Sequence, residues 1–326
     1  AFEACVFTFG IAQGGGAGKV LAEWVTEGAP EWDMWSCDPR RYTDYTDHDY
    51  CVKKGMEVYG HEYAMHFPWH RWPAAPDRKL SPVHDRVKAL GGQMGAYNGW
   101  ERANWFAKPG QAAEYAYSWK RQTFFDNVGD ELRAVREGVG LYDMSSFGKL
   151  RVEGPDATAV LNRICGAQMD VASGRIVYTQ FLNEAGGIEA DVTVTRLSET
   201  CYLVVTPAAT VRADAMWIRA HMGEARCVVT DVTSGEAVLA VMGPLSRKLL
   251  SRVSPDDFST AAFPFGMARE VEIGLGLARA HRVSYVGELG WEIYVSADMA
   301  ADTVSNAAAI SAALILATSL VCPIGA

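Results

Sequence analysis

The sequence lacks any cysteine pattern that would bind a metal or build a disulfide framework. Its seven cysteines are scattered and odd in number, and no two of them form a CxxC pair. Small secreted scaffolds and zinc domains need cysteines that are paired or closely spaced. The distribution therefore indicates a reducing compartment and argues against a disulfide-held fold or a zinc site.

Basic charge is also scarce. The chain has 30 Lys and Arg against 39 Asp and Glu, a formal net charge of −9, and no basic stripe. A protein that binds a nucleic-acid backbone usually gathers Lys and Arg on one face. We therefore expect no nucleic-acid partner.

Several catalytic motifs are absent. The sequence contains no GxSxG, which argues against a nucleophilic hydrolase of that class. It contains no GxGxxG dinucleotide fingerprint. His61, Glu62 and His66 form HExxxH, one residue longer than the zinc-binding HExxH, and we predict no metal there.

One apolar run, residues 307–324, reaches the length of a membrane span. It is rich in alanine and interrupted by Ser311, Thr318 and Pro323, so a buried helix is predicted instead, with no membrane partner. The chain begins at Ala1 without an initiator methionine, and we expect it to be a piece of a longer protein. Its predicted location is the cytoplasm of a bacterium or the mitochondrial matrix of a eukaryote.

A predicted β-hairpin at residues 175–196 is the most informative feature that is present. Tyr178, Phe181 and Leu182 make an apolar first arm, and Gly186-Gly187 is a hairpin turn signal. In the second arm, valine and threonine alternate with the period of a half-buried strand. Asp191 opens that arm on the side of Thr193 and Thr195, as a functional carboxylate or as a turn acid.

A second carboxylate lies between two glycines in residues 284–294, where Gly287 and Gly290 flank Glu288. Glycine lets a backbone approach a flat ligand closely. The amino-pyrimidinone edge of a pterin presents two adjacent N–H donors, and one carboxylate can accept both. The alternative is a solvated turn acid.

A glycine run at residues 10–19 precedes the apolar segment Val20–Val25. A glycine loop that leads into a helix N-terminus suits an anion or a polarised ring carbonyl, because free N–H groups and the helix dipole converge there. The run matches neither a Walker A loop nor GxGxxG, and its alternative is a simple glycine turn.

Helical periodicity predicts helices around residues 50–65, 83–90 and 124–138, and strands and helices interleave from residue 140 onward. This order predicts an α+β fold.

Three motifs together resemble a known family. Residues 140–157, 178–191 and 285–292 resemble, in order, the folate-binding domain of the glycine cleavage T-protein, an aminomethyltransferase. The first third resembles the dimethylglycine and sarcosine dehydrogenases, in their last flavin-contacting segment and their central linker domain. The resemblance implies an FAD-domain piece at 1–47, a linker domain at 48–110 and a T-protein-like domain, shortened at its C-terminus, at 111–326.

The resemblance also implies a function. The chain would be the C-terminal portion of a flavin-dependent N-methyl amine dehydrogenase that passes an oxidised one-carbon unit to tetrahydrofolate. Asp191 would be catalytic, and the folate would contact Tyr178, Asp191, Tyr285 and Glu288. FAD would contact Gly14, Gly15, Gly16, Gly18 and Lys19, although most of its site would lie upstream. The implied partners are a small N-methylated amine and folate, and a homo-oligomer is compatible with them.

Two departures from the T-protein pattern keep alternatives open. Thr206 stands where the family has a folate-contacting asparagine, and the family's C-terminal arginine is absent. One alternative is a stand-alone aminomethyltransferase that acts on a lipoyl-carried group. Another is a folate-binding fragment without catalytic activity.

Overall fold

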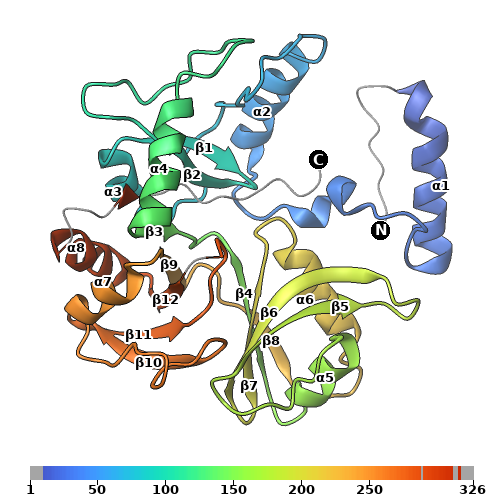
Figure 1. The fold of residues 1–326 in the computed structure, drawn as a ribbon. Coiled ribbons are helices and arrows are strands. Elements are labelled where there is room, and N and C mark those ends of the chain that lie inside the picture. The colour runs from blue at the N-terminus through green and yellow to red at the C-terminus, as the bar shows by residue number, and fades with distance from the viewer. Residues whose placement is uncertain (1–9, 288, 311–314, 317–326) are drawn as a thin grey trace. The chain divides into compact units, whose positions relative to one another are not determined.

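The computed structural model describes residues 10–287, 289–310 and 315–316 (Figure 1). The chain divides into two units, unit 1 at residues 1–43 and unit 2 at residues 44–326.

Unit 1 contains one long helix, α1 (Ile11–Glu27), followed by two short 3₁₀ turns, η1 (Trp35–Cys37) and η2 (Pro39–Arg41). The predicted glycine loop is wrong, because Gly14, Gly15, Gly16 and Gly18 all lie inside α1. Their amide groups bond to carbonyls one helical turn earlier, as Gly14 N does to Gly10 O at 3.1 Å. A glycine costs about 1 kcal/mol relative to alanine in a helix, and here the helical hydrogen bonds are made despite that cost.

Unit 2 begins with two helices and a hairpin. These are α2 (His48–Gly60), α3 (His84–Ala89), and the antiparallel strands β1 (Gly92–Tyr97) and β2 (Trp100–Phe106). Helix α4 (Phe125–Glu137) follows. The three helices predicted in this region are confirmed, with α2 ending five residues early.

Two larger sheets make up the rest of unit 2. The six-stranded sheet has the order β10-β11-β12-β9-β3-β13, and the five-stranded sheet has the order β5-β6-β7-β4-β8. The strands of the first are β3 (Gly140–Asp143), β9 (Glu236–Met242), β10 (Ala268–Ile273), β11 (Gly276–His281), β12 (Gly290–Ser296) and β13 (Ile315–Leu316). Those of the second are β4 (Gly148–Glu153), β5 (Ile176–Leu182), β6 (Ile188–Ser198), β7 (Cys201–Thr206) and β8 (Val228–Asp231).

Helices cover the outer face of each sheet (Figure 1). Helices α7 (Ser246–Val253) and α8 (Ala300–Ile310) pack on the six-stranded sheet. Helices α5 (Ala157–Ile164) and α6 (Val211–Ala220) pack on the five-stranded sheet. A third apolar cluster, which we call the inter-sheet layer, joins the inner faces. It contains Val135, Tyr142, Met144, Leu203, Val238, Ala240, Met242 and Tyr294.

The predicted helix over residues 307–324 is wrong in part. Helix α8 ends at Ile310, and Ile315 and Leu316 form β13, which pairs in parallel with Gly140 and Leu141 of β3. Residues 311–314 and 317–324 of that prediction lie outside the described residues. Among the helices that the structure describes, none is long and apolar enough to cross a membrane.

A lysine lies at the centre of unit 2. Lys149 on β4 is 0% exposed, and its Nζ donates to the carbonyl oxygens of Ser145 at 2.9 Å and Phe147 at 3.0 Å. These carbonyls belong to the connection between β3 and β4, which links the two sheets. Burial lowers the pKa of the Lys149 amine from its ordinary value of 10.5 to about 8, against the attraction of nearby carboxylates such as Glu236.

The lysine makes stability depend on alkaline pH. Between about pH 8 and 10.5 the unfolded chain holds a proton that the folded chain has released, so stability rises with pH across this window. Across the whole window the free energy of unfolding rises by about 3 kcal/mol. We expect Lys149→Met to remove this rise, measured as the free energy of unfolding in urea at pH 7 and pH 10. Lys248→Met, at an exposed position of α7, should keep the wild-type rise, and a Lys149→Met slope equal to that of wild type would contradict the assignment.

Candidate functional site

The predicted hairpin is confirmed as β5 and β6, and it places three polar side chains on one face. Gln180 pairs directly with Asp191, and Tyr178 pairs with Thr193. Residues one position away, such as Phe181 and Val192, are buried on the opposite face against α5 and α6. Because side chains alternate along a strand, Tyr178, Gln180 and Asp191 share the inner face of the sheet.

Two details of the prediction are corrected. Tyr178 was expected in an apolar arm, yet its side chain is 68% exposed. Asp191 was expected to open the second arm, whereas β6 begins three residues earlier, at Ile188. The turn that joins the strands is closed by Asn183, whose Oδ1 accepts from the Ala185 and Gly187 amides, and by Gly186 with a φ of 81°.

Both oxygens of the Asp191 carboxylate accept a hydrogen bond from β5. The Tyr178 hydroxyl donates to Oδ2 at 2.7 Å, and Gln180 Nε2 donates to Oδ1 at 3.0 Å. The hydrogen bond to Asp191 raises the pKa of the Tyr178 phenol above its ordinary value of 10. Asp191 itself is exposed, and its remaining lone pairs are available to a ligand.

The second predicted segment lies near this cluster. Tyr285, 57% exposed, follows β11, and its phenol contributes a small further rise to the pKa of Tyr178, after the larger effects of Asp191 and of burial. Tyr178 and Asp191 are thus in direct contact, and the Tyr285 phenol lies within electrostatic range of Tyr178. Glu288 lies outside the described residues.

Sequence reasoning missed Gln180. The signal was its spacing: it is two residues from Tyr178 on the same strand, so it had to share the same face. Its partner across the hairpin is fixed by the register, which the sequence leaves open.

Thr206, which the resemblance placed at a folate-contacting position, faces away from solvent. It is 2% exposed, and its hydroxyl donates to the Asp214 carboxylate on α6, which also accepts from Thr210 at 2.9 Å. Burial raises the pKa of Asp214 to about 6. The hydroxyl of Thr206 is thus used inside the fold.

The residues predicted to contact a flavin lie in unit 1. The ammonium of Lys19 bonds to Glu23 at 2.7 Å and Glu31 at 2.9 Å and lies 4.3 Å from the centre of the Trp32 ring. The four glycines are helical, as described above, so their amide groups are not free to bind a ligand.

The structure gives no support to a metal centre in the residues it describes. Their His, Cys, Asp and Glu side chains form no group of three or more that could hold a metal ion. His61, His66 and His70 have ring centroids 4.4–6.1 Å apart, and all three pack against Trp72.

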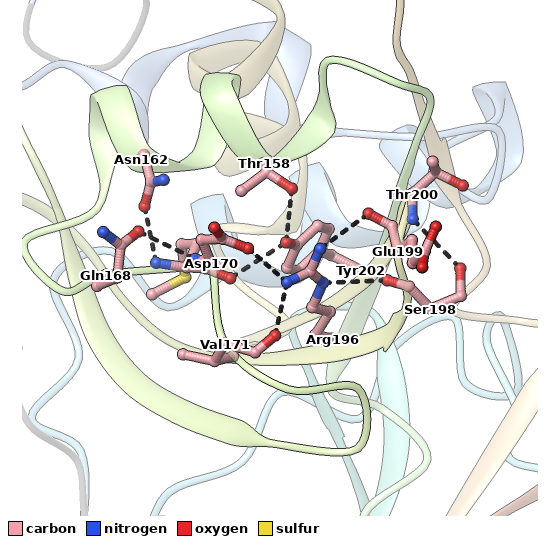
Figure 2. Close-up of polar contacts among 11 residues, drawn as sticks. Thr158, Asn162, Gln168, Asp170, Val171, Arg196, Ser198, Glu199, Thr200 and Tyr202 are labelled. Atoms are coloured by element: carbon pink, nitrogen blue, oxygen red, sulfur yellow. Dashed lines mark hydrogen bonds and ion pairs between the residues drawn. The ribbon is translucent and has the colours of Figure 1, made fainter.

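An arginine anchors the hairpin to its surroundings (Figure 2). Arg196, near the end of β6, donates to Asp170 Oδ1 and to the Val171 carbonyl, each at 2.6 Å. It also donates to the carbonyls of Ser198 at 3.3 Å and Glu199 at 3.2 Å. The same group thus joins the loop before β5 to the turn after β6, and it holds the open end of the hairpin, opposite the turn at Gly186.

Comparison with known protein families gives two matches. The GCVT N-terminal domain family matches residues 83–313, and the FAD dependent oxidoreductase central domain family matches residues 27–81. These matches confirm the predicted resemblance and the fold class.

Individual relatives agree. The 4-methylaminobutanoate oxidase (formaldehyde-forming) of Paenarthrobacter nicotinovorans is 43% identical over 292 residues, which is 89% of this chain and 35% of that protein. Mouse mitochondrial dimethylglycine dehydrogenase is 33% identical over 291 residues, 88% of this chain and 33% of that protein. The chain thus spans about a third of the length of these relatives.

Among solved structures, the aminomethyltransferase T of the glycine cleavage system from Bartonella henselae has a TM-score of 0.61 at 22% identity. The match covers 74% of this chain and 59% of that one. At this identity the likeness concerns the fold.

The anchoring role of Arg196 predicts a stability loss. The single ammonium group of a lysine cannot reach all four acceptors that the Arg196 guanidinium contacts. We therefore expect Arg196→Lys to lower the free energy of unfolding by about 2 kcal/mol. The exposed pair Arg151–Glu153 provides the control, because Arg151→Lys should change stability by less than about 0.5 kcal/mol. Urea unfolding measures both variants. An Arg196→Lys protein as stable as its control would show that the network does not hold the hairpin.

Proposed function

The chain belongs to the GCVT N-terminal domain family, and from that premise we propose that it receives a one-carbon unit on tetrahydrofolate. It would be the C-terminal portion of a flavin-dependent dehydrogenase of a small N-methylated amine, resembling dimethylglycine and sarcosine dehydrogenases. The product would be 5,10-methylene-tetrahydrofolate. The observation that carries the proposal is the exposed Asp191 carboxylate, held by Tyr178 and Gln180 beside Tyr285.

The residues present fit a reduced pteridine. Such a ring is flat and carries N–H donors on its edge. Two exposed phenol rings, those of Tyr178 and Tyr285, offer faces for contact, and Asp191 offers lone pairs for the donors. Glu288, two residues after Val286, would supply the second carboxylate to the ring edge.

Asp191 would act as the proton acceptor and charge stabiliser of the site. When bound, tetrahydrofolate supplies the nitrogen atoms that take up the one-carbon unit. The fixed carboxylate of Asp191 would stabilise positive charge beside these nitrogen atoms. It would also accept and hold a proton released at that position. Tyr178 donates to the carboxylate throughout and keeps it oriented.

The flavin part of the proposal rests on the family relation. The predicted contacts of FAD with Gly14, Gly15, Gly16, Gly18 and Lys19 stay a prediction. Because the amide groups of these glycines are used inside α1, no step is assigned to these residues. The redox half of the reaction would be carried by another part of the longer protein. The divisions at 1–47, 48–110 and 111–326 are likewise proposed, and the family matches at 27–81 and 83–313 support the order of the parts.

Calorimetric titration of the chain with tetrahydrofolate tests the proposal. We expect micromolar binding by wild type, and a double variant, Asp191→Asn with Glu288→Gln, should bind at least about 100-fold more weakly. Each lost charge-assisted contact accounts for at least about tenfold. The control is Glu184→Gln, an exposed acid in the turn of the same hairpin, which should bind as wild type does. A folded wild-type chain that fails to bind tetrahydrofolate, or a double variant that binds normally, would refute the site.

A further inference from the structure

We propose that Gln180 is a positioning residue for the Asp191 carboxylate, an inference that rests on the proposed folate site. Gln180 and Asp191 are direct cross-strand partners in the antiparallel ladder of β5 and β6. Directly opposed side chains on one face lie close enough to interact. The amide nitrogen Nε2 of Gln180 reaches Oδ1 of Asp191 at 3.0 Å.

The geometry removes the freedom that an exposed carboxylate normally has. The terminal torsion of an aspartate is broad, so a free carboxylate samples many orientations. Here Tyr178 holds one oxygen and Gln180 holds the other. Two donors on different oxygens fix the plane of the carboxylate, and the lone pairs that remain point in set directions.

Gln180 differs from Tyr178 in its place in the ladder. Gln180 is half-buried and is the residue directly opposite Asp191, whereas Tyr178 is 68% exposed and pairs with Thr193. Loss of the Gln180 donor therefore releases Oδ1, and the Tyr178 bond alone leaves rotation about the other oxygen.

Glutamine also suits the charge of the site. An amide donates without carrying charge, so it orients Asp191 and leaves its negative charge for a cationic imine or for the N–H groups of the ligand. A lysine or arginine at this position would form an ion pair and neutralise the carboxylate. The neutral amide of Gln180 thus fixes the orientation of the Asp191 carboxylate without neutralising its charge.

Two substitutions separate donation from packing. Gln180→Met keeps the length of the side chain and removes the N–H donor. Gln180→His places a ring N–H at a similar reach and restores one. Titration with tetrahydrofolate at pH 8 should show about tenfold weaker binding for Gln180→Met, the effect of one hydrogen bond to a charged group, and near-wild-type binding for Gln180→His. The control Gln122→Met, in the segment before α4, should leave affinity unchanged.

A ligand-free measurement keeps the two proposals apart. The ¹³Cγ NMR signal of Asp191 should move in Gln180→Met and return in Gln180→His. If neither the signal nor the affinity changes in Gln180→Met, or if both variants change equally, Gln180 does not position Asp191. If wild type shows no folate binding, the proposed function fails, and the carbon signal still decides whether Gln180 orients the carboxylate.

Discussion

The inter-sheet layer is the contact on which the rest of unit 2 depends. Strand β9 is buried on both faces: Ala237, Leu239 and Val241 face α7 and α8, and the residues between them face the five-stranded sheet. A strand of this kind has no solvated side, so both neighbouring layers must be present for it to form. The layer therefore sets the distance and orientation between the two sheets, and every group of the candidate site is positioned relative to it.

The layer covers only part of the five-stranded sheet, and this explains where the site lies. One cross-strand row on the inner face runs from Lys149 through Val205 and Thr193 to Tyr178. Lys149 is fully buried, Val205 and Thr193 are half-buried, and Tyr178 is 68% exposed. The other sheet thus covers β4 and β7 and leaves the edge strand β5 open. An edge position gives a large cofactor access, while the ladder behind it keeps the side chains in register.

Much of the site could be predicted from the sequence because its information is local. Period-2 alternation and Gly186-Gly187 determine the hairpin, and the hairpin brings Tyr178 and Asp191 together. The partner of Asp191 could not be predicted, because the register depends on how the turn closes through Asn183. β13 could not be predicted either, since its pairing with β3 joins residues far apart in sequence.

The prediction of a glycine loop at residues 10–19 was wrong for a different reason. Glycine favours loops by propensity, but each glycine in a helix costs only about 1 kcal/mol, and neighbouring helix formers can offset that. The segment after Lys19 contains alanine, leucine and glutamate, and α1 extends back through the glycines to Ile11. The glycine content therefore predicted a loop at a place where the helix-forming residues that follow extend the helix.

The arrangement at Asp191 combines two requirements that usually conflict. A group that contacts a large ligand must be exposed, yet an exposed side chain is mobile and loses entropy when it binds. Cross-strand donors resolve the conflict, because the ladder holds them independently of any ligand. The carboxylate then loses its conformational entropy when the chain folds, so this loss does not weaken the binding of the ligand. The half-buried anchor Arg196 extends the same logic outward, since it fixes the end of the hairpin opposite the turn, on the strands that carry both donors and the acceptor.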